Sequence, residues 1–191
     1  STAASDGYRG PDCGMDLASG LHMRLSDIAV LRDKAAAKGA TLFDVRHPHR
    51  DFPLGAGIKR PGKRLLTVGS DASVGKMYTT LAIEKELKAR GVAADFRATG
   101  QTGIFIAGDG VSVDAVVADF ISGATEWLSP DNAPDHWDLI EGQGSLFHPS
   151  FAGSRPACKR LSPAREMPRG VSPLQPRFRK MMFRFGHAVV S

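Results

Sequence analysis

Apolar residues recur with two different periods along this chain, and each change of period marks a predicted element. Residues 65–68 form a short apolar or β-branched run, which predicts a buried strand. Within residues 76–90, Thr80, Ile83 and Leu87 recur at helical spacing with charged residues between them, which predicts a helix. The same reasoning predicts strands over 41–45, 92–96 and 137–140, a helix over 114–123, and a helix capped by Ser26 and ended by Gly39.

Strands that alternate with helices indicate an α/β protein. Residues 1–50 form a first α/β piece, and residues 51–63 are rich in Pro, Gly and Lys, so we interpret them as a linker. Residues 64–153 form the main domain, for which we expect a doubly wound, mostly parallel sheet. Residues 154–191 contain five prolines and seven arginines with little apolar periodicity, so we expect an irregular basic tail.

The net charge of +5 belongs to this tail alone. Nine of the 25 Lys and Arg residues but only one of the 20 Asp and Glu residues lie in 154–191, so the body of the chain is slightly acidic. We therefore expect no specific nucleic-acid partner. No apolar run approaches the ~20 residues of a membrane span. The two cysteines, Cys13 and Cys158, have no metal-site spacing, so we predict no metal site and a cytoplasmic location.

The most informative stretch is LLTVGSDASVGKMYTT, residues 65–80. A strand that turns through glycines into a helix brings backbone N–H groups, the helix dipole and a lysine to one point, and together these bind phosphate. The usual loop is G-x-x-x-x-G-K-[ST]. This one has an extra residue between its glycines, and Met77 stands where a magnesium-binding hydroxyl is usual. The predicted phosphate contacts are Gly69, Ser70, Asp71, Ala72, Ser73, Val74, Gly75, Lys76, Met77 and Tyr78.

Two further strand ends carry polar, glycine-rich sequences, residues 97–103 and 141–145. Because ligands of doubly wound sheets bind beyond the carboxyl ends of the strands, we expect both segments to lie near the phosphate loop. Glu141 can hold magnesium, accept a proton from an amine or position a water molecule. The alternative for Glu141 is a solvated loop acid.

Several motifs carry a resemblance to a known family. The segments GMDLASGLHMRLSDI, LFDVRHP, GKRLLTVGSDASVGKMYTTLA, DFRATGQTGI and DHWDLIEGQGSLFHPSFAG resemble a bacterial P-loop family long classed as a domain of unknown function. That family includes D-glutamate N-acetyltransferases of D-amino-acid catabolism, and the loop itself is similar to that of dethiobiotin synthetase. The resemblance runs over residues 14–153 and implies a Rossmann-like domain, of which residues 1–50 are the end, followed by the P-loop domain. After Gly153 this chain departs from the family, as a frame-shifted or fused tail would, and we expect it to be a truncated form.

The resemblance implies acetyl transfer from acetyl-CoA to the amino group of D-glutamate or a similar amino acid. Coenzyme A phosphates would lie on residues 69–78, and the substrate carboxylates on Arg97, helped by Thr99 and Gln101. Glu141 or His148 would take the amine proton, and the alternative for His148 is a packed structural role. We also expect a homo-oligomer.

Two other functions stay open at this point. One is an ATP-dependent ligase or kinase of the dethiobiotin synthetase type, with Asp71 and Glu141 on magnesium. The other is an inactive fragment whose basic tail binds polyanions without specificity.

Overall fold

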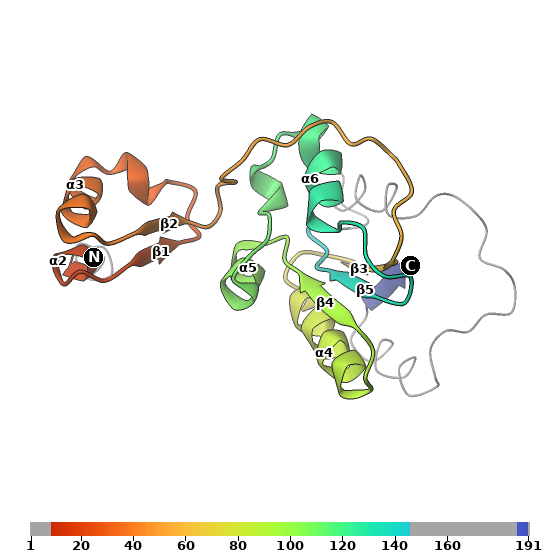
Figure 1. The fold of residues 1–191 in the computed structure, drawn as a ribbon. Coiled ribbons are helices and arrows are strands. Elements are labelled where there is room, and N and C mark those ends of the chain that lie inside the picture. The colour runs from red at the N-terminus through yellow and green to blue at the C-terminus, as the bar shows by residue number, and fades with distance from the viewer. Residues whose placement is uncertain (1–8, 146–186, 191) are drawn as a thin grey trace, which may run out of the picture. The chain divides into compact units, whose positions relative to one another are not determined.

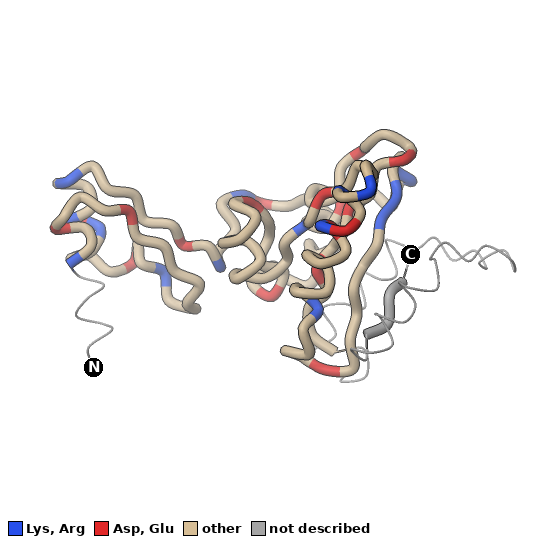
Figure 2. The backbone as a smooth tube through the Cα atoms, turned by 90° about the horizontal axis from the view of Figure 1, so that it is seen from below, with Lys and Arg blue, Asp and Glu red and all other residues tan. Residues whose placement is uncertain are grey.

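The computed structural model describes residues 9–145 and 187–190, and the chain divides into two compact units, 1–49 and 50–191 (Figure 1). His148 and most of the predicted tail lie outside the described residues. None of the described helices is long and apolar enough to cross a membrane. In the described backbone, Lys and Arg residues are interspersed with Asp and Glu residues in both units (Figure 2).

The first unit is a small parallel α/β piece. Its elements are α2 (Arg9–Asp12), β1 (Leu17–Ser19), the 3-10 helix η1 (Leu25–Asp27), α3 (Ala29–Lys38) and β2 (Leu42–Asp44), and β1 pairs with β2 in parallel. The predicted helix end is confirmed, because Gly39 closes α3 with φ 66° in the left-handed region. The predicted cap is wrong, since α3 begins after Ile28 and Ser26 lies in η1.

Ser26 does not cap α3 because Asp44, at the end of β2, holds it in the preceding turn. The Asp44 carboxylate accepts hydrogen bonds from the Ser26 hydroxyl at 2.7 Å and from the backbone N–H groups of Leu25 and Ser26 at 2.5 and 3.2 Å. Burial alone would raise the pKa of Asp44, but these hydrogen bonds and the nearby His47 outweigh it and lower the pKa. The contact therefore joins η1 to β2.

The second unit is built on a four-stranded sheet in the order β4-β5-β3-β6. The strands β3 (Lys63–Gly69), β5 (Trp137–Ile140) and β4 (Ala94–Arg97) are parallel, as the sequence predicts. The fourth strand, β6 (His187–Val190), pairs antiparallel with β3. The segment expected to be an irregular tail thus contains one short strand, residues 187–190, which pairs with the edge of β3.

Helices cover both faces of this sheet, with α4 (Lys76–Ala89) on one side and α6 (Ile121–Leu128) on the other (Figure 1). Successive residues of a strand point to opposite faces, so neighbouring residues of β3 join different cores. Leu65 packs in the cluster that includes Ile83 of α4. Leu66 and Val68 pack in the cluster that includes Ala124 and Leu128 of α6. This two-sided burial explains why β3 is a nearly continuous apolar run.

The region between β4 and α6 differs from its prediction. It contains α5 (Gln101–Ala107), the 3-10 helices η2 (Val113–Ala115) and η3 (Ala118–Phe120), and then α6, so the predicted helix over 114–123 is wrong. The physical reason is a competing set of backbone contacts. The N–H groups of Val111 and Val113 donate to the carbonyl groups of Ala98 and Thr99 at 3.1 and 3.0 Å, which holds this segment extended. A regular helix therefore begins only at Ile121.

The segment interpreted as a linker packs closely along α6. Phe52 is buried in the core, and the Gly55 N–H donates to the Ser122 hydroxyl at 3.2 Å. The N–H groups of Ala56 and Gly57 both donate to the Glu126 carboxylate at 2.8 Å. The Pro, Gly and Lys content that indicated a linker thus belongs to an irregular segment fixed by hydrogen bonds to one helix.

Candidate active site

The phosphate loop connects β3 to α4 in a compact turn. Gly75 precedes the helix with φ 94°, and Ser73 also has a left-handed backbone, with φ 57°. A Cβ atom on Gly69 would lie 2.6 Å from the Val74 side chain, so the start of the loop needs glycine. The backbone N–H groups at the start of α4 thus lie beside the turn, as a phosphate site requires.

Lys76 is the cation of this loop, and it is buried, with 6% of its surface exposed. Its ammonium group donates to the carbonyl oxygens of Asp71 at 2.7 Å and Gly144 at 2.9 Å. Burial lowers the pKa of Lys76, while the charges of Asp71 and Glu141 act in the opposite direction. The lysine therefore joins the loop after β3 to the loop after β5.

Glu141 follows β5 directly and is also buried, with 6% of its surface exposed. One carboxylate oxygen, Oε2, accepts hydrogen bonds from the N–H groups of Thr99 at 3.1 Å and Gly100 at 3.2 Å. Burial raises the pKa of Glu141, while hydrogen bonds from Thr99, Gly100 and Gln143 and the charge of Lys76 act against that rise. The result is a carboxyl group held in place by the loop after β4, with a raised proton affinity.

Lys76 and Glu141 border the same cavity of about 400 Å³. The cavity lies at the carboxyl ends of β3, β4 and β5, and its other lining residues come from the loops and helices that follow these strands: Ser73, Gly75, Met77, Tyr78, Gly100, Gln101, Thr102, Gly142 and Gln143. The structure thus brings the predicted cation and the predicted acid to one site. Such a cavity can hold an anionic group on the lysine side and a proton-donating group on the glutamate side.

The remaining predicted residues are divided between this cavity and its surroundings. Gln101 lines the cavity. Thr99 lies behind it, where its hydroxyl donates to the carbonyl oxygen of Glu141 at 2.5 Å. Five of the predicted phosphate contacts are not among the lining residues: Gly69, Ser70, Asp71, Ala72 and Val74.

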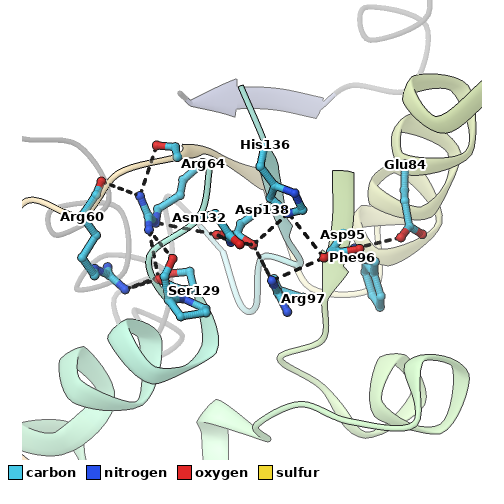
Figure 3. Close-up of polar contacts among 12 residues, drawn as sticks. Arg60, Arg64, Glu84, Asp95, Phe96, Arg97, Ser129, Asn132, His136 and Asp138 are labelled. Atoms are coloured by element: carbon cyan, nitrogen blue, oxygen red, sulfur yellow. Dashed lines mark hydrogen bonds and ion pairs between the residues drawn. The ribbon is translucent and has the colours of Figure 1, made fainter. Parts of the chain in front are cut away.

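Arg97 is placed elsewhere, in a polar cluster around the fully buried Asp138 (Figure 3). Its Nε and a terminal nitrogen lie 2.8 and 2.7 Å from Asp138 Oδ1, and Asn132 donates to both carboxylate oxygens at 3.1 Å. The guanidinium group compensates a carboxylate that has no access to water. Arg97 is not among the residues that line the cavity of Lys76 and Glu141, so its predicted role in substrate binding stays a prediction.

Comparison with known proteins identifies the family of this chain. A family model described as "Domain of unknown function (DUF1611_C) P-loop domain" matches residues 53–157, more than half of the chain. The chain belongs to the DUF1611 family. A second model of the family, a Rossmann-like domain, matches residues 11–48. The resemblance drawn from the motifs and the predicted α/β fold class are therefore confirmed.

Individual DUF1611 relatives are substantially longer than this chain. It is 61% identical over 140 residues to a D-glutamate N-acetyltransferase of Tritonibacter scottomollicae and 57% identical to a protein of the same name from Pseudoalteromonas sp.. Each match covers 73% of this chain and 42% of the relative. A crystal structure of a DUF1611 protein from Anabaena variabilis is 38% identical, with a TM-score of 0.73 over 84% of this chain and 47% of that one.

A role for Gly142, which follows Glu141 in this DUF1611 chain, was not predicted from the sequence. A Cβ atom at Gly142 would lie 1.7 Å from the carbonyl oxygen of Thr67, so only glycine fits where the segment after β5 approaches β3 this closely. Gln143 was also missed, and its side chain donates to the Thr99 hydroxyl at 3.2 Å while it lines the cavity. The signal was present in Glu-Gly-Gln-Gly after a predicted strand, but the pairing of β3 with β5 was needed to interpret it.

Proposed function

We propose that this chain carries the phosphate-binding site of an N-acetyltransferase that moves the acetyl group of acetyl-CoA to the amino group of D-glutamate or a similar amino acid, in D-amino-acid catabolism. The observation that carries the proposal is the shared cavity of Lys76 and Glu141. The names of the two relatives support the reaction. Because the chain spans less than half of their length, the activity of the whole protein belongs to the proposal.

The lysine side of the cavity suits the phosphate groups of coenzyme A. An ammonium group has three protons, and two of those on Lys76 are directed to the carbonyl oxygens of Asp71 and Gly144. The third can donate to a phosphate oxygen, and the backbone N–H groups at the start of α4 add further donors. Since two of these contacts already exist without a ligand, little reorganisation is needed for binding.

The glutamate side suits the amine chemistry. An ammonium substrate must lose a proton before its nitrogen can attack the thioester carbonyl carbon, and Glu141 with its raised proton affinity can accept that proton. The C–N bond then forms, the C–S bond breaks, and the departing sulfur takes the second amine proton to leave as a thiol. Glu141 releases its proton to water at the end of the cycle. We propose Gln101 as a hydrogen-bonding partner of the amino acid, because it lines the same cavity.

The second candidate is an ATP-dependent ligase or kinase with Asp71 and Glu141 on magnesium. In its favour, the Asp71 carbonyl touches Lys76 and Glu141 lies at the same cavity. Against it, Met77 offers a thioether where magnesium sites of this kind use a hydroxyl oxygen. A cytoplasmic location and a homo-oligomeric state stay predictions.

The test is a thiol-release assay with acetyl-CoA and either D-glutamate or L-glutamate. We expect thiol release that depends on the D-amino acid in a full-length relative, and the same reaction at reduced rate in this chain. Release of phosphate from ATP without thiol release would instead establish the second candidate. Absence of both reactions in the full-length protein would contradict the proposal.

A further inference from the structure

Two threonine hydroxyl groups lie directly behind the phosphate loop, and both side chains are fully buried. Thr67 lies on β3 and Thr80 lies on α4, with their Oγ1 atoms 2.8 Å apart. Thr80 Oγ1 is 2.7 Å from the carbonyl oxygen of Lys76. Thr67 Oγ1 is 3.3 Å from the N–H nitrogen of Gly142, the residue that follows Glu141. The two hydroxyl groups thus connect the start of α4 to the end of β5.

The chemistry of the two ends, together with the shortest distances, gives the direction of this chain of hydrogen bonds. The Gly142 N–H can only donate and the Lys76 carbonyl can only accept. Thr67 Oγ1 also lies 3.5 Å from the carbonyl oxygens of Lys76 and Ile140. The shorter contacts of 2.8 and 2.7 Å favour the direction in which Thr67 accepts from Gly142 and donates to Thr80, and Thr80 donates to Lys76. With this arrangement each hydroxyl donates once and accepts once, so the buried polar atoms are satisfied.

The backbone contact between β5 and β3 places this chain of hydrogen bonds accurately. Gly142 lies so close to Thr67 that a Cβ atom would meet its carbonyl oxygen at 1.7 Å. This close approach brings the Gly142 N–H to the Thr67 hydroxyl. A shift of α4 along the sheet would break the contact between Thr67 and Thr80 before it disturbed the helix itself, because the hydrogen bond to Lys76 lies within α4.

We propose that Thr67 and Thr80 are positioning residues of the acetyl-CoA site, which hold Lys76 and Glu141 at a fixed separation across the cavity. This inference rests on the proposed function. We expect the hydroxyl pair to affect ligand affinity in addition to any effect that it has on folding. A misplaced charge loses much of its interaction with a phosphate group, because the hydrogen bond depends steeply on geometry.

A matched control separates this role from an ordinary structural one. Thr125 of α6 is also buried, and its hydroxyl donates to the carbonyl oxygen of Ile121 at 2.8 Å, four residues earlier, as Thr80 does to Lys76. Thr125 is not a lining residue of the cavity, and its helix α6 lies on the opposite face of the sheet from α4 (Figure 1). Replacing either threonine by valine keeps the shape and removes one hydroxyl.

The experiment compares Thr80→Val, Thr67→Val and Thr125→Val in the 191-residue chain, with Thr80→Ser as the variant that keeps the hydroxyl. Calorimetry measures the affinity for acetyl-CoA and, separately, for inorganic pyrophosphate. Nuclear magnetic resonance measures hydrogen exchange at the Gly142 amide. We expect Thr80→Val and Thr67→Val to lower the affinity for both ligands about tenfold or more and to speed hydrogen exchange at the Gly142 amide. Thr125→Val and Thr80→Ser should leave affinity and exchange near the wild-type values.

Equal affinity and equal Gly142 exchange in Thr80→Val and Thr125→Val would overturn the inference. If one valine variant does not fold, the other gives the same comparison. The wild-type chain could also bind pyrophosphate but not acetyl-CoA. If Thr80→Val then weakens pyrophosphate binding, the result would support the positioning role and contradict the proposed function. Binding of neither ligand by the wild-type chain would overturn both.

Discussion

At the scale of single residues, the site contains two opposite charges that the main chain keeps in place. The Lys76 ammonium is held by two carbonyl groups and the Glu141 carboxylate by two N–H groups. Buried charges are unfavourable unless hydrogen bonds replace their lost water, and here backbone groups provide that replacement. Burial lowers the pKa of one group and raises that of the other, so both are drawn toward their neutral forms. Groups in this state are suited to proton transfer.

Replacement of Lys76 tests the phosphate contact. Lys76→Ala should weaken acetyl-CoA binding by about 1.5–3 kcal/mol, the usual loss for a hydrogen bond to a charged group. Lys85→Ala is the matched control, because Lys85 lies on the same helix but is exposed, and it removes the same charge. Titration calorimetry measures both. Equal affinities of the two variants would show that Lys76 does not contact the ligand.

Replacement of Glu141 tests the proton acceptor. At the corresponding position of a full-length relative, Glu141→Gln should retain acetyl-CoA affinity and lower turnover by about 10²–10⁴-fold. Turnover of the parent protein should fall as the pH decreases through the raised pKa of Glu141, because only the carboxylate accepts a proton. Glu86→Gln, a change on the solvent side of α4, should have no such effect. Full turnover in Glu141→Gln would remove this residue from the mechanism.

The same carboxyl group should make stability depend on pH. The pKa of Glu141 in the folded protein lies above its ordinary value of 4.5, so folding favours the protonated form. Its contribution to the free energy of unfolding is therefore complete below that value and is lost as the pH increases through the folded pKa. Glu141→Gln should flatten this part of the stability curve, measured by urea unfolding at a series of pH values from about pH 4 upward. An unchanged slope would contradict the assigned pKa direction.

At the scale of elements, the sequence predicted those parts whose local pattern and tertiary packing agree. The strands β3 and β5 contain short apolar runs that lie in the core, and α4 presents Thr80 and Ile83 to it at helical spacing; the limits of all three were close to the predicted ones. The stretch before α6 was misassigned because its N–H groups pair with residues at the end of β4, a contact that no local pattern shows. Residues 51–63 were interpreted as a linker because the hydrogen-bond partners of this segment, Ser122 and Glu126, are about 70 residues away in the sequence.

Close packing between α6 and the segment before β3 predicts whether a glycine-to-alanine change in α6 stabilises or destabilises the protein. Glycine in a helix is normally less stable than alanine by about 1 kcal/mol, so Gly→Ala usually stabilises. At Gly123, however, a Cβ atom would lie 1.8 Å from the carbonyl oxygen of Pro53. Gly123→Ala should therefore destabilise the second unit by about 1–3 kcal/mol, as measured by urea unfolding. A stabilised variant would show that the segment does not lie against α6.

At the scale of the whole molecule, the site depends on contacts between distant parts of the chain. Lys76 contacts Gly144, which is 68 residues later in the sequence, and Thr99 contacts Glu141, which is 42 residues later. The rule that ligands bind at the carboxyl edge of a parallel sheet was sufficient to predict that these segments meet. It was not sufficient for Arg97, because burial of Asp138, 41 positions away, directs the guanidinium group toward that carboxylate. Side-chain direction at a strand end is decided by which charges are buried nearby.

The central claim is that the cavity of Lys76 and Glu141 binds the phosphate groups of acetyl-CoA. The most direct measurement is the melting temperature of the 191-residue chain with acetyl-CoA and with ATP and magnesium, repeated for Lys76→Ala and Lys85→Ala. A ligand that binds the folded state alone stabilises it. The account predicts that acetyl-CoA raises the melting temperature of the parent chain and of Lys85→Ala but not of Lys76→Ala, and that ATP with magnesium has little effect. A rise with ATP and magnesium that Lys76→Ala abolishes, without a rise with acetyl-CoA, would contradict it.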